Sequence, residues 1–140
     1  MIRAAILDDI PAMVAMGEVF TTKAGFASHV GYDPPSVARL LATIIESDNG
    51  VCLIGDKSMA AAMLFPHPFN NEHITAQEMF WWSETGGGVA LFNALCDAVK
   101  AKGAQSLVMV AVDAIRPEAT GRFYERNGFH LVERNYMKVF

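Results

Sequence analysis

The chain has 140 residues, of which 52% are hydrophobic and 19% are charged, and its formal net charge is −4. That length is about one domain, and the apolar content excludes a disordered chain, which would bury too little surface to offset its ordering entropy. The most apolar windows, 51–69 and 105–115, are interrupted by charges or prolines, so neither supplies the roughly 18 apolar residues of a membrane-spanning helix.

The N-terminal sequence and the distribution of charge indicate the compartment and the kind of ligand. Asp8 and Asp9 follow the first apolar residues too closely for the core of a signal peptide, which predicts a cytoplasmic protein. Residues 1–99 carry 4 basic and 11 acidic side chains, whereas residues 100–140 carry 7 basic and 4 acidic ones. This distribution argues against general nucleic-acid binding and suits a local site for an anionic ligand.

The two cysteines, Cys52 and Cys96, both lie in apolar segments. Two such residues give neither a disulfide framework nor the ligand spacing of a zinc site. A cysteine in an apolar setting is usually a small buried hydrophobe. We therefore expect no metal in the functional site.

The first half of the chain predicts one strand and two helices. Side-chain capping residues, a proline near a helix start and apolar positions at helical spacing mark the helices. The expected elements are a strand at 2–7, a helix that starts after Asp8 or Asp9, a loop at 24–35 and a helix at 36–47.

The second half changes to strand patterns separated by turns. Two apolar runs flank the turn at 55–58, which is typical of a hairpin. The expected elements are hairpin strands at 51–54 and 59–65, a strand at 74–82 buried on both faces, a helix at 89–102, a buried strand at 107–112, a helix at 118–127 and a strand at 129–140. The order β-α-α-β-β-β-α-β-α-β predicts one mixed sheet with helices on both faces, in a single domain over residues 1–140.

Three consecutive glycines stand between the strand at 74–82 and the helix at 89–102, within the segment 85–90 (TGGGVA). Such a loop can turn its N–H groups inward beside the positive end of a helix, which predicts a phosphate-binding cradle. A flexible strand-to-helix turn is the alternative reading. A P-loop is excluded because no Lys-Ser or Lys-Thr follows the glycines, and contiguous glycines lack the spacing of a Rossmann fingerprint.

A second motif, Tyr124-x-x-x-Gly128-Phe129, ends a helix at a glycine and leads into a strand. Alone, it predicts aromatic core residues around a helix end. Together with the strand, glycine loop and long helix before it, the motif resembles the GNAT family of acyl-CoA-dependent N-acetyltransferases, over residues 74–140. The resemblance implies an α/β (α+β) fold with a mixed, mostly antiparallel central sheet and helices on both faces.

The resemblance also implies acetyl-CoA as co-substrate. The family's phosphate motif, Gln/Arg-x-x-Gly-x-Gly/Ala, falls on 85–90, where Gly88 and Ala90 match and Thr85 replaces the usual Gln or Arg. The strand ending at Trp82 would be bulged and splayed from the next strand, opening a slot for the arm of the co-substrate. Pro117 and Thr120 stand where the family often has Asn and Ala. The expected cofactor-binding residues are Trp82, Thr85, Gly86, Gly87, Gly88, Val89, Ala90 and Arg122.

Arg116, Arg122 and Arg126 lie in or just before the helix that would flank the slot. Guanidinium groups there could meet phosphates. A solvated helix face is the alternative interpretation for each of them.

Catalytic roles come from the same resemblance. It implies that Tyr124 is the general acid that protonates the leaving thiolate. Glu78 is the preferred general base, since members of the family can place a carboxylate at this position. A surface or ion-paired glutamate is the alternative for Glu78, and three further candidates for the base are His73, His29 and Tyr32.

The expected function is transfer of an acetyl group from acetyl-CoA to a primary amine by direct attack in a ternary complex, because no Cys or Ser has an evident nucleophile setting. A non-catalytic CoA-binding module on the same fold and a nucleotide-binding domain are the alternatives. The acceptor, a small-molecule or peptide amine, is left open, and no nucleic acid or membrane is expected as a partner. The apolar end at 136–140 could pair at a sheet edge, which leaves a homodimer open.

Overall fold

The computed structural model describes residues 1–140, which form two compact units. The sheet unit comprises Met1–Gly17 and Asp33–Met109, and the C-terminal unit comprises Glu18–Tyr32 and Val110–Phe140. The single domain expected over residues 1–140 stays a prediction. No helix combines the length and the apolar character that a membrane span requires.

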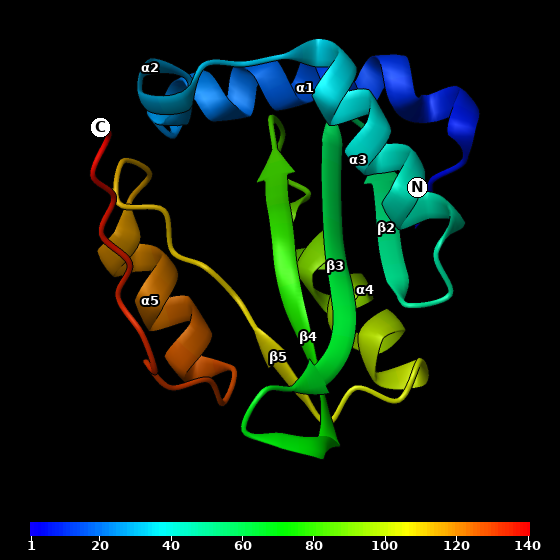
Figure 1. Cartoon of the computed structure of the whole chain (residues 1–140), viewed down its shortest axis with the longest axis vertical. Helices are drawn as coiled ribbons and strands as arrows, with labels where there is room; N and C mark the ends of the chain where they lie inside the picture. Colours follow the sequence, from blue (N-terminus) through cyan, green and yellow to red (C-terminus); the bar gives the residue numbers. More distant parts are fainter. The chain divides into compact units, whose positions relative to one another are not determined.

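Five strands form the sheet of the sheet unit, in the spatial order β1-β2-β3-β4-β5 (Figure 1). Strands β1 to β4 pair antiparallel, and β5 pairs parallel with β4. A parallel pair needs a crossover connection, which is supplied by helix α4 (Gly88–Ala101). The predicted mixed, mostly antiparallel sheet is therefore confirmed. The strands are β1 (Arg3–Ala4), β2 (Gly50–Gly55), β3 (Ser58–His67), β4 (Asn70–Ser83) and β5 (Ser106–Val108).

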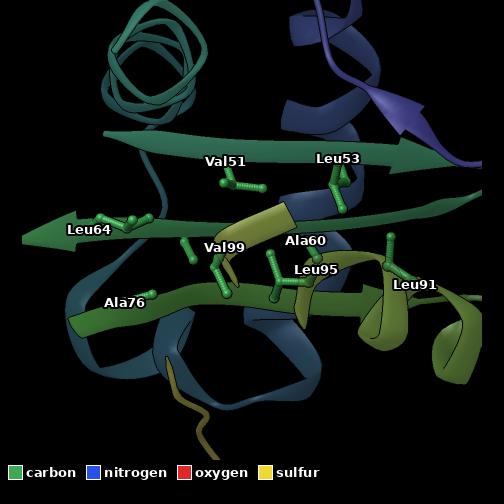
Figure 2. Packing of buried hydrophobic residues seen from close by; sticks show 9 residues of the cluster. Val51, Leu53, Ala60, Leu64, Ala76, Leu91, Leu95 and Val99 are labelled. Atoms are coloured by element: carbon green, nitrogen blue, oxygen red, sulfur yellow. The ribbon is translucent and has the colours of Figure 1, made fainter. Parts of the chain in front are cut away.

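Helix α4 packs on one face of this sheet through an apolar stripe (Figure 2). Leu91, Leu95 and Val99 follow one another at intervals of four residues, which places them on one helix face, and all three are buried. Below them the sheet presents small side chains such as Ala60 and Ala76, both fully buried. Small residues under large ones bring the helix close to the sheet, and each buried leucine contributes about 1.5–3 kcal/mol.

Helix α3 (Pro34–Glu46) covers the other face of β2 and β3, in front of the sheet in Figure 1. It starts where the Asp33 carboxylate accepts the N–H of Ser36 at 3.0 Å, which satisfies one of the donors that a helix start leaves without a partner. Leu41 and Ile44, each 1% exposed, face inward. The helix predicted at 36–47 is confirmed, with its start two residues earlier.

The N-terminal strand predicted at 2–7 is wrong in length, because only Arg3–Ala4 pair with β2. The chain then forms a 3-10 turn, η1 (Leu7–Asp9), followed by helix α1 (Ile10–Lys23). The Asp9 carboxylate accepts the N–H of Ile6 at 2.8 Å and two hydrogen bonds from Arg3, at 2.7 and 2.8 Å. These bonds to Arg3 and Ile6 lower the pKa of Asp9 from 3.8 to about 2, and they turn the backbone out of the strand.

The C-terminal unit contains two helices of its own. Helix α2 (Phe26–Val30) lies between Gly25 and Gly31, whose φ angles of 82° and 75° start and stop it. The loop predicted at 24–35 is therefore wrong in its central part. Helix α5 (Pro117–Arg126) confirms the helix predicted at 118–127 and ends before Gly128, whose φ is 85°.

Two predicted strands are wrong in extent or absent. The strand predicted at 107–112 is reduced to β5, whose three residues are half-buried rather than buried. The strand predicted at 129–140 does not form, and residues 130–140 are exposed. The alternating apolar residues of that segment match a strand, but a strand forms only where its backbone groups find a ladder partner. No strand of the sheet pairs with it.

Candidate functional site

The glycine loop connects β4 to α4 and stands at the surface of the sheet unit. Gly86 and Gly87 are exposed, and Gly88 is half-buried as the first residue of α4. No side chain caps the start of the helix at Gly87. Because the first N–H groups of a helix have no intrahelical acceptor, they and the positive end of the helix dipole form an uncapped anion-binding edge.

The glycines leave space above this edge. Apart from its own residue and its two chain neighbours, a Cβ atom on Gly86 or Gly87 would have no heavy atom within 4 Å, and one on Gly88 would lie 3.7 Å from the Cβ of Ser83. None of the three has a positive φ angle. Backbone strain therefore does not require glycine at these positions. What the missing side chains provide is an open approach to the backbone, which suits a phosphate group.

The carbonyl side of the loop is bonded to neighbouring strands and turns. The indole N–H of Trp81 donates to the Gly88 carbonyl at 3.0 Å, and the Ser83 hydroxyl donates to the Thr85 carbonyl at 2.6 Å. The Thr85 hydroxyl in turn donates to the Asp56 carbonyl at 3.4 Å, in the turn between β2 and β3. The Thr85 side chain is thus used within the protein, where the resemblance expected a phosphate contact.

Strand β4 has the irregularity that the resemblance predicted. Ala61 lies opposite Phe80 and Ala62 lies opposite Glu78, so Met79 is an extra residue in a β-bulge. Met79 is 41% exposed, which corrects the expectation of a strand buried on both faces. A bulge bends a strand and ends or redirects its pairing.

The ladder between β4 and β5 is short. It covers only Thr75–Gln77 against Ser106–Val108, so it does not extend along residues 78–83. The pairing thus ends at Gln77, and the splaying of the two strands beyond it stays a prediction. A strand edge of this kind can bind an extended, amide-bearing molecule as an added strand would.

Glu78 and Trp82 lie on this part of β4. Each is 9% exposed, and Glu78 is the only charged residue among the buried ones. Its cross-strand neighbour Ala62 belongs to the core under α4. The buried carboxylate, the tryptophan and the glycine loop therefore follow one another along a single stretch of chain, from residue 78 to residue 90, with Glu78 opposite Ala62 and Trp82 opposite Met59.

Tyr124 and Arg122 belong to the C-terminal unit. Tyr124 is 7% exposed, and its hydroxyl donates to the Val110 carbonyl at 2.7 Å. The end of α5 folds back on the same residue, since the N–H groups of Asn127 and Phe129 both bond to the Tyr124 carbonyl. Arg122 is exposed on α5.

The other candidates for the base have different surroundings. His73 Nε2 lies 2.9 Å from the Ser106 hydroxyl, and this hydroxyl donates to the Thr75 hydroxyl. His73 therefore takes part in the hydrogen bonds that link the start of β5 to β4. His29 is exposed on α2. Tyr32 is half-buried, and burial, with a smaller effect of Glu18, raises its pKa.

Two details of the site were not found from the residue pattern, although the resemblance implied a bulge somewhere in this strand. The bond from Trp81 to Gly88 joins residues seven apart across a loop, and no local pattern encodes it. The bulge at Met79 depends on the register between β3 and β4, which the sequence of β4 does not specify by itself. The surplus of aromatic residues directly before the glycines is the only local signal that points to Trp81.

Comparison with known proteins identifies this architecture. A predicted acetyltransferase of Clostridium acetobutylicum, solved with acetyl-CoA, is 16% identical over 100% of this chain and 95% of that chain, with a TM-score of 0.75. A ribosomal-protein-alanine N-acetyltransferase of Brucella melitensis biovar Abortus 2308 is 16% identical over 100% and 99%, with a TM-score of 0.66. A transcriptional regulator of Bacillus halodurans C-125 is 21% identical over 100% and 99%, with a TM-score of 0.72.

No protein-family model matches the sequence, and no curated protein matches it. The structural likeness nevertheless covers 99–100% of the chain, so the chain shares the fold of these acetyltransferases, in agreement with the fold that the resemblance implied.

Proposed function

We propose that this protein is an acetyl-CoA-dependent N-acetyltransferase that transfers the acetyl group to a primary amine by direct attack in a ternary complex. The observation that carries this function is the combination of an open glycine loop at an uncapped helix start with a strand that is bulged at Met79. A phosphate-bearing ligand with a long amide arm needs both features, since one binds anions and the other pairs with amides.

The residues present fit such a co-substrate. Gly86, Gly87 and Gly88 leave room for a pyrophosphate, which the N–H groups of Val89 and Ala90 would bind at the start of α4. We assign Trp82 to the wall of the slot and Arg122 to a phosphate contact. Thr85 would contact the co-substrate through its backbone and not through its side chain. Acetyl-CoA would supply the acetyl group as an activated thioester.

The chain itself supplies the acid and the base in this proposal. Glu78, a buried carboxylate on the slot strand, accepts the proton of the acceptor amine, directly or through water. Tyr124 donates a proton to the departing thiolate. The Tyr124 hydroxyl is hydrogen-bonded to the Val110 carbonyl, so this role requires it to exchange one acceptor for another.

The acceptor is proposed as a small-molecule or peptide amine, in the cytoplasm, with no nucleic acid, membrane or metal involved. No group of three or more His, Cys, Asp or Glu side chains is arranged to hold a metal ion. The exposed apolar residues at the C-terminus, including Tyr136 and Phe140, leave a homodimer as part of the proposal.

One observation favours a second candidate, a non-catalytic CoA-binding module. Thr85 stands where the family has Gln or Arg, and its side chain is bonded to Asp56, so it cannot replace the missing phosphate contact without breaking that bond. The loss of a contact that the family's enzymes keep favours a protein on this fold that binds CoA without turning it over.

Two measurements test the proposed function. The melting temperature should rise with CoA or acetyl-CoA concentration, corresponding to about 2.7 kcal/mol at a hundredfold excess over the dissociation constant, and ATP should have a smaller effect. Thiolate release from acetyl-CoA over a panel of amines should then identify an acceptor. A flat melting temperature up to millimolar CoA would refute CoA binding, and binding without thiolate release for any amine would favour the non-catalytic module.

A further inference from the structure

The hydrogen bond from Trp81 to the Gly88 carbonyl gives a role to a residue that lies beneath the glycine loop. We infer that Trp81 is a positioning residue for the phosphate cradle: its indole N–H holds the Gly88 carbonyl and thereby aims the next peptide N–H, that of Val89, outward. This role rests on the proposed function, because it assigns Trp81 to the grip on the co-substrate phosphates.

The geometry places the indole directly under the start of α4. Trp81 Nε1 lies 3.0 Å from the Gly88 carbonyl oxygen, and a Cβ on Gly88 would lie 3.8 Å from the Trp81 ring. The ring is itself held in place, since it packs against Phe92 with 5.6 Å between ring centroids and contacts the core under α4. A rigid donor therefore meets the first peptide of the helix.

Peptide planarity connects this bond to the ligand side. The C=O of Gly88 and the N–H of Val89 belong to one planar unit and point in opposite directions. A donor that fixes the carbonyl inward therefore fixes the N–H outward. Glycine is the residue whose backbone turns most easily, so the indole bond adds to the hold of the helix on the peptide after Gly88.

Ser83 acts in the same way at the other end of the loop. Its hydroxyl donates to the Thr85 carbonyl at 2.6 Å, which by the same planarity orients the N–H of Gly86. Residues 81 and 83 are two apart on β4 and so lie on one face of the strand. One strand face thus carries two donors that hold two carbonyls and leave two N–H groups for the ligand.

The test compares two variants that perturb the same ring contact differently. Trp81→Phe removes the indole N–H and keeps an aromatic ring, whereas Phe92→Leu weakens the ring packing and keeps the N–H. Loss of one neutral hydrogen bond corresponds to a reduction of about 3- to 10-fold in CoA affinity. We expect that loss for Trp81→Phe and less than a twofold change for Phe92→Leu, measured by calorimetry below both melting temperatures.

A second ligand separates positioning from a general structural effect. Pantetheine lacks the phosphates of CoA, so Trp81→Phe should leave its binding, followed by ligand-observed NMR, within twofold of the parent protein. Equal losses of CoA and pantetheine affinity, equal CoA losses in both variants, or unchanged CoA binding in Trp81→Phe would each overturn the positioning role. The proposed function fails separately, if the parent protein itself does not bind CoA.

Discussion

Replacing Gly87 with aspartate should change stability and CoA affinity in opposite directions. Gly87 precedes α4 with φ −85° and ψ 7°, a conformation open to residues with side chains. A carboxylate there lies beside the N–H groups at the helix start, which is worth about 0.3–1 kcal/mol. The loss of glycine freedom in the unfolded chain adds about 0.4–1 kcal/mol. The melting temperature should therefore rise by about 2–7 °C.

The same carboxylate should oppose the ligand. At an effective dielectric constant of about 20, two like charges about 4–8 Å apart repel by roughly 2–4 kcal/mol, which corresponds to a loss of about 30- to 1000-fold in CoA affinity. Gly87→Asn is the matched control, because its side chain has nearly the same size and no charge. It should gain the entropic part of the stability and lose less than about tenfold in affinity.

Thermal melts without ligand and titration calorimetry with CoA measure both effects. The affinity lost by the aspartate variant should shrink as salt is raised, since screening weakens the repulsion. If the aspartate and asparagine variants bind CoA equally well, the glycine loop does not hold the phosphates.

Two further predictions concern other parts of the chain. Tyr124→Phe should lower turnover by about 10²- to 10⁴-fold, the usual contribution of a general acid, with little change in CoA affinity. Loss of the hydrogen bond to Val110 should lower the free energy of unfolding by about 0.5–1.5 kcal/mol. Unchanged turnover would assign the proton to another donor. Asp9, whose pKa is lowered to about 2 by Arg3, stabilises the fold above pH 4, where it is ionised in both states, and loses this contribution as pH falls toward 2. Asp9→Asn should thus be less stable than the parent at pH 7 in urea melts and equal to it near pH 2, and a constant difference would contradict the ion-pair explanation.

The parts of the fold that could be predicted are those with local signals. The hairpin of β2 and β3 is defined by its turn at 55–58, and α4 and α5 begin and end at glycines or prolines that the sequence displays. Helix α2 was missed because five residues are too few to show a helical period. The segment 129–140 shows the opposite error, since its alternation is local but strand formation depends on a partner elsewhere.

The candidate site also has features that the sequence predicted and features that it did not. The glycine loop was found from its consecutive glycines and Tyr124 from the resemblance to the GNAT family, and the structure gives both a defined setting. The bulge at Met79 and the indole bond from Trp81 arise from how β3 and α4 meet β4. Such contacts join distant residues, so composition and periodicity carry no record of them.

The three-residue ladder between β4 and β5 also bears on the order in which the sheet is assembled. Strands β2, β3 and β4 follow one another through tight turns and close only short loops, whereas β5 reaches β4 after the whole of α4 has been crossed. Contacts between segments distant in sequence form slowly, so β5 should join after β2, β3 and β4 have paired. During that interval the outer edge of β4 presents unpaired backbone groups to any neighbouring chain. The pairing of β5 is therefore a step at which crowding and synthesis rate affect the yield of folded protein.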